Sequence, residues 1–183
     1  MADLIVVSGP PGSGKSTVAR ILSGMFEPSA LVAGDAFFAM LDRGYIQAWT
    51  PAADRQNEIV IGAAAAAAGR LAAGGYTVIY DGVIGPWFLD TFGTATGLAE
   101  IHYVILLPPQ DVCLERVRSR TGHGFGDPDA TRHMYREFAQ ATTGAHRTIT
   151  TIAAAEAIAV SIVDLVRSGS LRWHVERSSA PPS

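Results

Sequence analysis

The chain has 183 residues, of which 48% are hydrophobic and 17% are charged, and its net charge at pH 7 is −3. This length is typical of one domain, and this composition excludes an intrinsically disordered chain. The negative charge provides no basic face for the phosphates of DNA or RNA, so we expect no nucleic-acid partner. Of the 14 basic residues, 13 are arginine and only Lys15 is lysine. That single lysine needs a physical explanation.

Three features predict a soluble, cytoplasmic protein with no membrane contact. No apolar run approaches the 18 residues of a membrane span. The first ten residues, MADLIVVSGP, lack the charged region and the cleavage site of a signal peptide. Because Cys113 is the only cysteine, it can form no disulfide within the chain. We expect Cys113 to pack within a helix rather than to act as a nucleophile.

Apolar runs bounded by turn residues predict strands that alternate with helices. The predicted strands cover residues 4–7, 31–33, 76–80, 101–107 and, more weakly, 147–150. The predicted helices cover residues 18–25, 51–73, 87–97, a segment ending near 120, 129–141 and 153–167. Such alternation is typical of βαβ units with a parallel sheet between two helical layers. We therefore expect a three-layer α/β/α fold, with one domain over 1–177 and a frayed tail over 178–183.

The long helix predicted over 51–73 is rich in alanine, the best helix former. Val60, Ala64, Ala67 and Leu71 recur at helical spacing and form a stripe of mostly small side chains. We expect this stripe to lie close against the sheet.

Residues 9–16, GPPGSGKS, fit the pattern G-x-x-x-x-G-K-[ST] between a strand and a helix. In such a loop the backbone N–H groups curve into a nest for anions, and the helix that follows adds its positive end. Lys15 would reach the β- and γ-phosphates of ATP, and the Ser16 hydroxyl would bind Mg²⁺. A compact ammonium fits inside this loop, where a guanidinium would not. The predicted nucleotide contacts here are Gly9, Pro10, Pro11, Gly12, Ser13, Gly14, Lys15, Ser16 and Thr17.

Asp35 follows the second predicted strand, Asp81 follows the third, and arginines precede a glycine-rich stretch over 121–128. With these features the sequence resembles the small P-loop kinases over nearly its whole length. That group includes shikimate and gluconate kinases, chloramphenicol phosphotransferase and uncharacterised short ATP-binding proteins of AAA type. The resemblance implies a P-loop NTPase fold with a five-stranded parallel sheet and a helical lid at about 120–130.

The two acids have a functional and a structural interpretation. The resemblance implies that Asp35 contacts the acceptor hydroxyl and takes its proton, whereas the alternative makes Asp35 the N-cap of a helix over 36–41. Asp81 ends a buried strand in the Walker B pattern, so its carboxylate would support Mg²⁺. The alternative for Asp81 is an ordinary Asp-Gly turn.

Arg116 and Arg120 are four residues apart and share one face of a helix. Similar kinases use an arginine pair here, one near the adenine and one on the phosphates, where cations offset transition-state charge. We predict that both contact the nucleotide and that Arg120 is catalytic. Arg118 points elsewhere, while Arg132 and Arg136 flank the far side of the lid. The alternative for all of these arginines is a solvated charged face.

Six aromatic residues follow the second and third strands, where an acceptor would lie. Aromatic residues are more often core than pocket residues, and both interpretations stay open. They are Phe37, Phe38, Tyr45, Trp49, Trp87 and Phe88.

These predictions together favour a kinase that transfers the γ-phosphoryl group of Mg·ATP to a hydroxyl of a small molecule. Candidate acceptors are a sugar acid, a nucleoside-like compound and an antibiotic, and a toxin-like kinase of nucleotide sugars would use the same residues. The main alternative is an ATP-binding regulator or ATPase with a protein partner. A GTPase is disfavoured, because its guanine-reading Asn/Thr-Lys-x-Asp motif needs a second lysine. The oligomeric state is not predicted.

Overall fold

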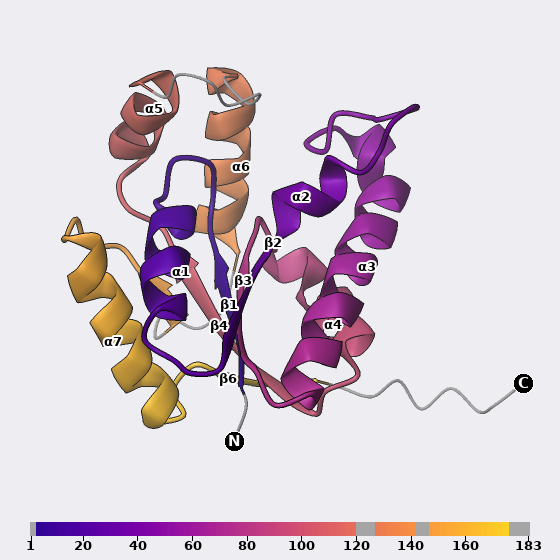
Figure 1. The fold of residues 1–183 in the computed structure, drawn as a ribbon. Helices are drawn as coiled ribbons and strands as arrows, with labels where there is room; N and C mark the ends of the chain where they lie inside the picture. The colour runs from indigo at the N-terminus through magenta and orange to yellow at the C-terminus, as the bar shows by residue number, and fades with distance from the viewer. Residues whose placement is uncertain (1–2, 120–126, 142–146, 176–183) are drawn as a thin grey trace, which may run out of the picture.

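A parallel β-sheet lies between two layers of helices in the computed structural model, which describes residues 3–119, 127–141 and 147–175 (Figure 1). Five parallel strands have the order β2-β3-β1-β4-β5, and β6 pairs with β4 in the antiparallel direction. The strands are β1 (Leu4–Ser8), β2 (Ser29–Ala33), β3 (Thr77–Asp81), β4 (Glu100–Leu106), β5 (Thr148–Ile149) and β6 (Arg172–His174). The predicted α/β/α architecture of a P-loop NTPase is confirmed.

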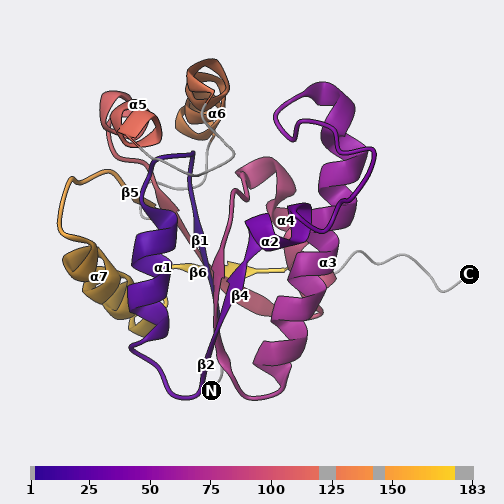
Figure 2. The ribbon, with the colours of Figure 1, turned by 45° about the horizontal axis from the view of Figure 1, so that its top comes forward.

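The helices connect the strands and cover both faces of the sheet. They are α1 (Lys15–Ser23), α2 (Gly34–Phe38), α3 (Asp54–Ala73), α4 (Pro86–Thr96), α5 (Gln110–Ser119), α6 (Pro128–Gln140) and α7 (Ala155–Arg167), with a 3-10 turn, η1, over Pro51–Ala53. Figure 2 shows α1 and α7 on one side of the sheet, α3 and α4 on the other, and α5 and α6 above one end of the strands.

Successive side chains of β1 point to opposite faces of the sheet and so contribute to both halves of the core. Ile5 and Val7 pack with residues of α1 and α7, while Leu4 and Val6 pack with residues of α3 and α4. All five residues of β1 are buried, as expected of a central parallel strand. The carboxyl end of β1 is therefore held rigidly where the phosphate loop begins.

The inward face of the alanine-rich helix α3 agrees only in part with the predicted stripe. Val60 and Ala64 are buried as predicted, but Leu71 is 36% exposed, and Ile61, Ala65 and Ala68 are buried as well. The stripe was therefore wrong at Leu71, since small alanines on every side leave the apolar pattern weakly directional.

Two short elements were not predicted as such. The strand β6 brings Arg172–His174 back to the start of β4. The helix α2 begins at Gly34 rather than at residue 36, and Ala33 is its N-cap. Residues 120–126, most of the predicted lid, and the predicted tail and domain boundary near 177 lie outside the described residues. Within the described ranges, no helix is long and apolar enough to cross a membrane.

Candidate active site

The phosphate loop can take its shape only because glycines occupy it. Gly9, Gly12 and Gly14 have φ angles of 140°, 80° and 97°, a region that other residues rarely adopt. A Cβ at Gly9 would lie 2.2 Å from the carbonyl oxygen of Leu106, and one at Gly12 would lie 2.2 Å from that of Cys113. The loop is thus pressed between the end of β4 and the helix α5.

The side chain of Lys15 lies within this loop and is 9% exposed. Its Nζ donates a hydrogen bond of 3.0 Å to the carbonyl oxygen of Pro10. The Oγ of Ser13 is buried without a hydrogen-bond partner, whereas Ser16, at the start of α1, is exposed. A buried ammonium, an unsatisfied hydroxyl and a helix N-terminus together fit a phosphate chain.

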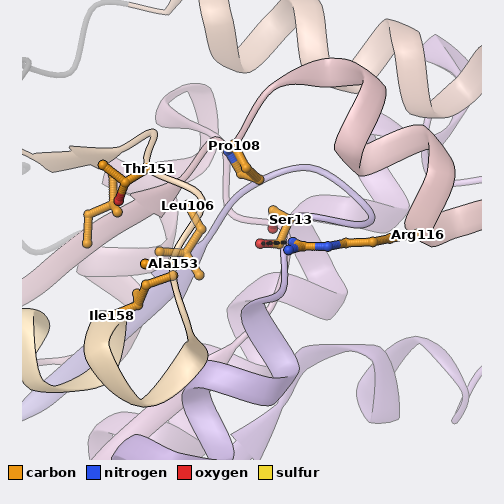
Figure 3. Close-up of a pocket in the computed structure, with 8 residues that line it drawn as sticks. Ser13, Leu106, Pro108, Arg116, Thr151, Ala153 and Ile158 are labelled. Atoms are coloured by element: carbon orange, nitrogen blue, oxygen red, sulfur yellow. Dashed lines mark hydrogen bonds between the residues drawn. The ribbon is translucent and has the colours of Figure 1, made fainter.

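Arg116 extends from α5 across the phosphate loop. Its Nη1 donates to the carbonyl oxygens of Gly12 and Ser13 at 3.4 and 3.5 Å (Figure 3). Arg116 thus lies beside the phosphate loop, and its contact with a nucleotide stays a prediction. Arg118 is exposed, and Arg120 lies outside the described residues.

The arginines beyond the predicted lid lie on α6. Arg132 forms an ion pair with Asp129 at 2.6 Å, and Arg136 is exposed. Asp127 caps this helix by accepting from the backbone N–H groups of Asp129 and Ala130. The geometry of α6 therefore favours the solvated interpretation for Arg132 and Arg136.

A cavity of about 330 Å³ opens beside Arg116, between the start of α1 and the segment that leads into α7. Figure 3 shows the adjoining hollow, with Ala153 and Ile158 facing Ser13 and Arg116. The sequence did not indicate that the segment leading into α7 lines a cavity. Alanines and an isoleucine after a weakly predicted strand carry no chemical signal. The one available indication of a ligand site was that this segment follows the last parallel strand, since ligands bind beyond the carboxyl ends of such strands. The lining residues of the cavity are Ser13, Gly14, Thr17, Val18, Arg116, Ser119, Ala153, Ala155 and Ile158.

The two acids lie at the same edge of the sheet as the loop. Asp81 is the last residue of β3 and is in register with Val7 of β1 and Ala33 of β2. Asp35 lies in the first turn of α2, is exposed, and makes no side-chain capping hydrogen bond. The N-cap interpretation of Asp35 is therefore wrong, and its carboxylate faces solvent.

Tyr80 lies next to both acids and was not singled out from the sequence, because a tyrosine inside an apolar strand is typical of core packing. Burial raises the pKa of its hydroxyl, and the nearby carboxylates of Asp35 and Asp81 raise it further. The hydroxyl therefore keeps its proton across the physiological pH range.

Hydrogen bonds fix the turn that follows Asp81. The Oγ of Ser8 donates to the carbonyl oxygen of Ile84 at 2.7 Å and accepts from its N–H at 3.0 Å. The hydroxyl of Tyr103 also donates to that carbonyl oxygen, at 2.7 Å. Residues of β1 and β4 thus hold the segment between Asp81 and α4.

Of the six aromatic residues predicted to lie near an acceptor, Trp49 is half-buried, and the other five divide into two groups. Phe37, Phe38 and Phe88 pack partly buried against the core. Tyr45 and Trp87 are 47% and 45% exposed, and the ring of Trp87 lies 5.3 Å from that of Phe138 on α6. Tyr45 and Trp87 therefore offer more exposed surface than the three phenylalanines.

The loop between α2 and η1 is tied to α3. The side-chain amide of Gln56 both accepts from the N–H and donates to the carbonyl of Ile46, each at 2.8 Å. Asn57 donates to the carbonyl oxygen of Ala48 at 2.7 Å. These bonds hold the loop against the first turns of α3.

A family model described as an AAA domain matches residues 4–145. The chain belongs to this family. The predicted membership among short P-loop proteins of AAA type is thereby confirmed. Comparison with curated protein sequences gives no significant match.

Solved structures share the fold of this AAA-domain chain at low sequence identity. The tunicamycin resistance protein of Deinococcus radiodurans is 20% identical, covers 100% of both chains and has a TM-score of 0.64. A gluconokinase from Sinorhizobium meliloti 1021 is 20% identical over 92% of this chain and 94% of its own, with a TM-score of 0.64. Shikimate kinase from Acinetobacter baumannii, in complex with shikimate, is 21% identical over 93% and 96%, with a TM-score of 0.58. These structures share the α/β/α fold of this chain.

Proposed function

We propose that this protein transfers the γ-phosphoryl group of Mg·ATP to a hydroxyl group of a small molecule. One observation carries the proposal: the loop that holds Lys15 and the acids Asp35 and Asp81 follow three adjacent strands at one edge of the sheet. Ligands of open α/β sheets bind at this edge. The arrangement provides phosphate binding and an exposed carboxylate within one site.

On the donor side, the loop N–H groups and the Lys15 ammonium bind the phosphates, and the nucleoside occupies the cavity beside Arg116. The Ser16 hydroxyl and the Asp81 carboxylate would hold Mg²⁺, which when bound offsets charge on the phosphates. Arg120, outside the described residues, stays a predicted catalytic cation. These groups orient the γ-phosphoryl group toward Asp35.

On the acceptor side, Asp35 accepts the proton of the acceptor hydroxyl as its oxygen forms the bond to the γ-phosphorus. The bond from that phosphorus to the β–γ bridging oxygen breaks, and ADP keeps the electron pair. Because Asp35 is exposed in the first turn of α2, an acceptor can reach it without unfolding of the helix.

The names of the similar structures suggest which acceptors to test first. One is complexed with shikimate, one is a gluconokinase and one is a tunicamycin resistance protein. We therefore propose a panel of shikimate, gluconate, tunicamycin, nucleosides, a nucleotide sugar and phenicol antibiotics. This panel samples the sugar-acid, nucleoside-like and antibiotic classes.

The decisive experiment follows transfer of labelled γ-phosphate to this panel. We expect the wild type to label at least one acceptor. Lys15→Ala should lose ATP binding, whereas Asp35→Asn should bind ATP normally and lose about 10²- to 10⁴-fold in transfer rate. Asp42→Asn, a 95% exposed acid in the neighbouring loop, is the matched control and should keep full activity.

Two results would contradict the kinase proposal. One is wild-type transfer to no acceptor while ATP is bound or hydrolysed, which would favour the ATP-binding regulator. The other is full transfer by Asp35→Asn, which would remove Asp35 from the chemistry.

A further inference from the structure

The ring of Tyr80 fills the space between two glycines that flank the site. Tyr80 is 1% exposed, and its ring meets that of Phe92 edge-on at 4.7 Å. A Cβ at Gly34 would lie 2.5 Å from the Tyr80 hydroxyl oxygen. A Cβ at Gly82 would lie 2.6 Å from the ring and 3.0 Å from that oxygen. The absence of a side chain at each glycine therefore makes room for this tyrosine.

Each of these glycines is the chain neighbour of one of the acids. Gly34 precedes Asp35 at the start of α2, and Gly82 follows Asp81 at the end of β3. The wedged ring therefore sets the separation between the two backbone turns that carry the carboxylates. Because the contacts on Gly34 and Gly82 are close, the ring allows little change in that separation.

The hydroxyl of Tyr80 is not used by the surrounding protein. It makes no hydrogen bond to any residue in the described ranges, although the hydroxyl of a buried tyrosine usually has a partner. Solvent reaches this oxygen, since the enclosed polar atoms without a partner do not include it. The other fully buried tyrosine, Tyr103, shows the usual case, with its hydroxyl bonded to Ile84. The carboxylates of Asp35 and Asp81 both raise the pKa of this hydroxyl, beyond the effect of burial.

We propose that Tyr80 is a positioning residue for Asp35, with its ring spacing the two acid-bearing turns and its O–H dipole orienting the Asp35 carboxylate toward the acceptor. The distance between the two turns is a property of the fold. Its importance for catalysis rests on the proposed role of Asp35 as base. Phenylalanine would fill nearly the same volume but would lack the dipole. Tyr80→Phe therefore separates the two contributions of the side chain.

The first test requires no acceptor. Protein labelled with ¹³C at the aspartate carboxyl groups is compared by NMR at pH 7, with Asp35→Asn identifying the Asp35 signal. Tyr80→Phe should shift that signal, because the nearby dipole is lost. Tyr103→Phe, which also removes a buried hydroxyl, should leave it in place. An Asp35 signal that does not move in Tyr80→Phe, or moves equally in both variants, overturns the proposal.

A second test uses thermal unfolding to probe the close contact between Tyr80 and Gly34. Gly34→Ala should lower the Tm, and it should lower it less in a Tyr80→Phe background, because the atom nearest to the new methyl group is then missing. Equal losses of Tm in the two backgrounds would contradict the placement of the hydroxyl against Gly34. This readout is independent of any enzymatic activity.

Kinetics with an acceptor found in the panel then connects the geometry to transfer. Tyr80→Phe should lower kcat by about tenfold, typical of a lost interaction with a charged group, and leave the Kd for ATP unchanged. An unchanged kcat would overturn the positioning role. If the panel yields no acceptor but the NMR and Tm results hold, the kinase proposal fails and the spacing role of Tyr80 stands.

Discussion

At the scale of single residues, the environment of Lys15 explains an imbalance in the composition. Arginine occupies 13 of the 14 basic positions. The exposed arginines on α1, α3 and α5 contact solvent or a carboxylate. Lys15 instead lies in a loop of backbone groups, with its Nζ 3.0 Å from a carbonyl oxygen. A narrow site of this kind favours a compact ammonium over a planar guanidinium.

Although Lys15→Arg conserves the charge, it should therefore strongly weaken nucleotide binding. We expect the affinity for Mg·ATP to fall at least about tenfold, a loss of about 1.4 kcal/mol, because the larger group must leave the loop or distort it. Titration calorimetry measures the change. The control is the opposite exchange on the exposed face of α1, Arg20→Lys, which should not alter affinity. Wild-type affinity in Lys15→Arg would show that charge alone suffices there.

At the scale of elements, the crossing of α3 and α4 depends on a single glycine. A Cβ at Gly69 would lie 2.0 Å from the carbonyl oxygen of Thr96, at the end of α4. The other interior glycine of α3, Gly62, has open space where its Cβ would be. Both positions carry glycine and so have the same intrinsic helix propensity. They differ in packing, because a side chain would clash at Gly69 and would meet open space at Gly62.

Alanine at these two positions should change stability in opposite directions. Gly62→Ala should raise the free energy of unfolding by about 0.5–1 kcal/mol, the usual gain for alanine in a helix. Gly69→Ala should lower it by about 1–3 kcal/mol, because the backbones must move apart. Urea denaturation of both variants gives the comparison. A gain of stability in Gly69→Ala would contradict close packing of α3 on α4.

The elements also show what the sequence could and could not predict. The order of strands and helices and the phosphate loop followed from strong local signals, such as the apolar run of β1 and the glycines after it. The inward face of α3 did not, because alanine is compatible with burial and exposure alike. Tyr80 was missed as well, since its contact with Gly34 exists only when β2 and β3 lie side by side.

At the scale of the whole molecule, the sheet is completed far from the candidate site. The strand β6 pairs with the beginning of β4, around His102. His102 is 5% exposed, and its Nδ1 is buried without a hydrogen-bond partner. The three-residue β6 has no apolar pattern of its own, and the residues it pairs with lie far earlier in the chain, so sequence periodicity could not reveal it.

Burial of His102 should make global stability dependent on pH. Burial lowers the pKa of His102 below its ordinary value of 6.5, an effect that Arg172 reinforces and that Asp3 and Glu100 oppose. The unfolded chain then binds a proton more readily than the folded protein. The contribution of His102 to the free energy of unfolding should therefore decrease as the pH falls below about 6.5, and level off below the folded pKa.

Denaturation curves between pH 5 and 8 can isolate this contribution. In His102→Gln the part of the pH dependence due to this residue should disappear, leaving a flatter profile below about pH 6.5. His133→Gln, in which a 51% exposed imidazole of α6 is replaced, should keep the slope of the wild type. Identical profiles for His102→Gln and the wild type would rule out the imidazole as the source.

The central position of β1 has a consequence for the synthesis of the chain. Leu4 pairs with Val78 and Ile5 with His102, so the first strand made has no partner until β3 and then β4 have left the ribosome. Pairings so distant in sequence slow folding and leave an apolar strand exposed meanwhile. ATP therefore cannot assist early folding, because the loop that would bind it has no walls until β4 and α5 have been made.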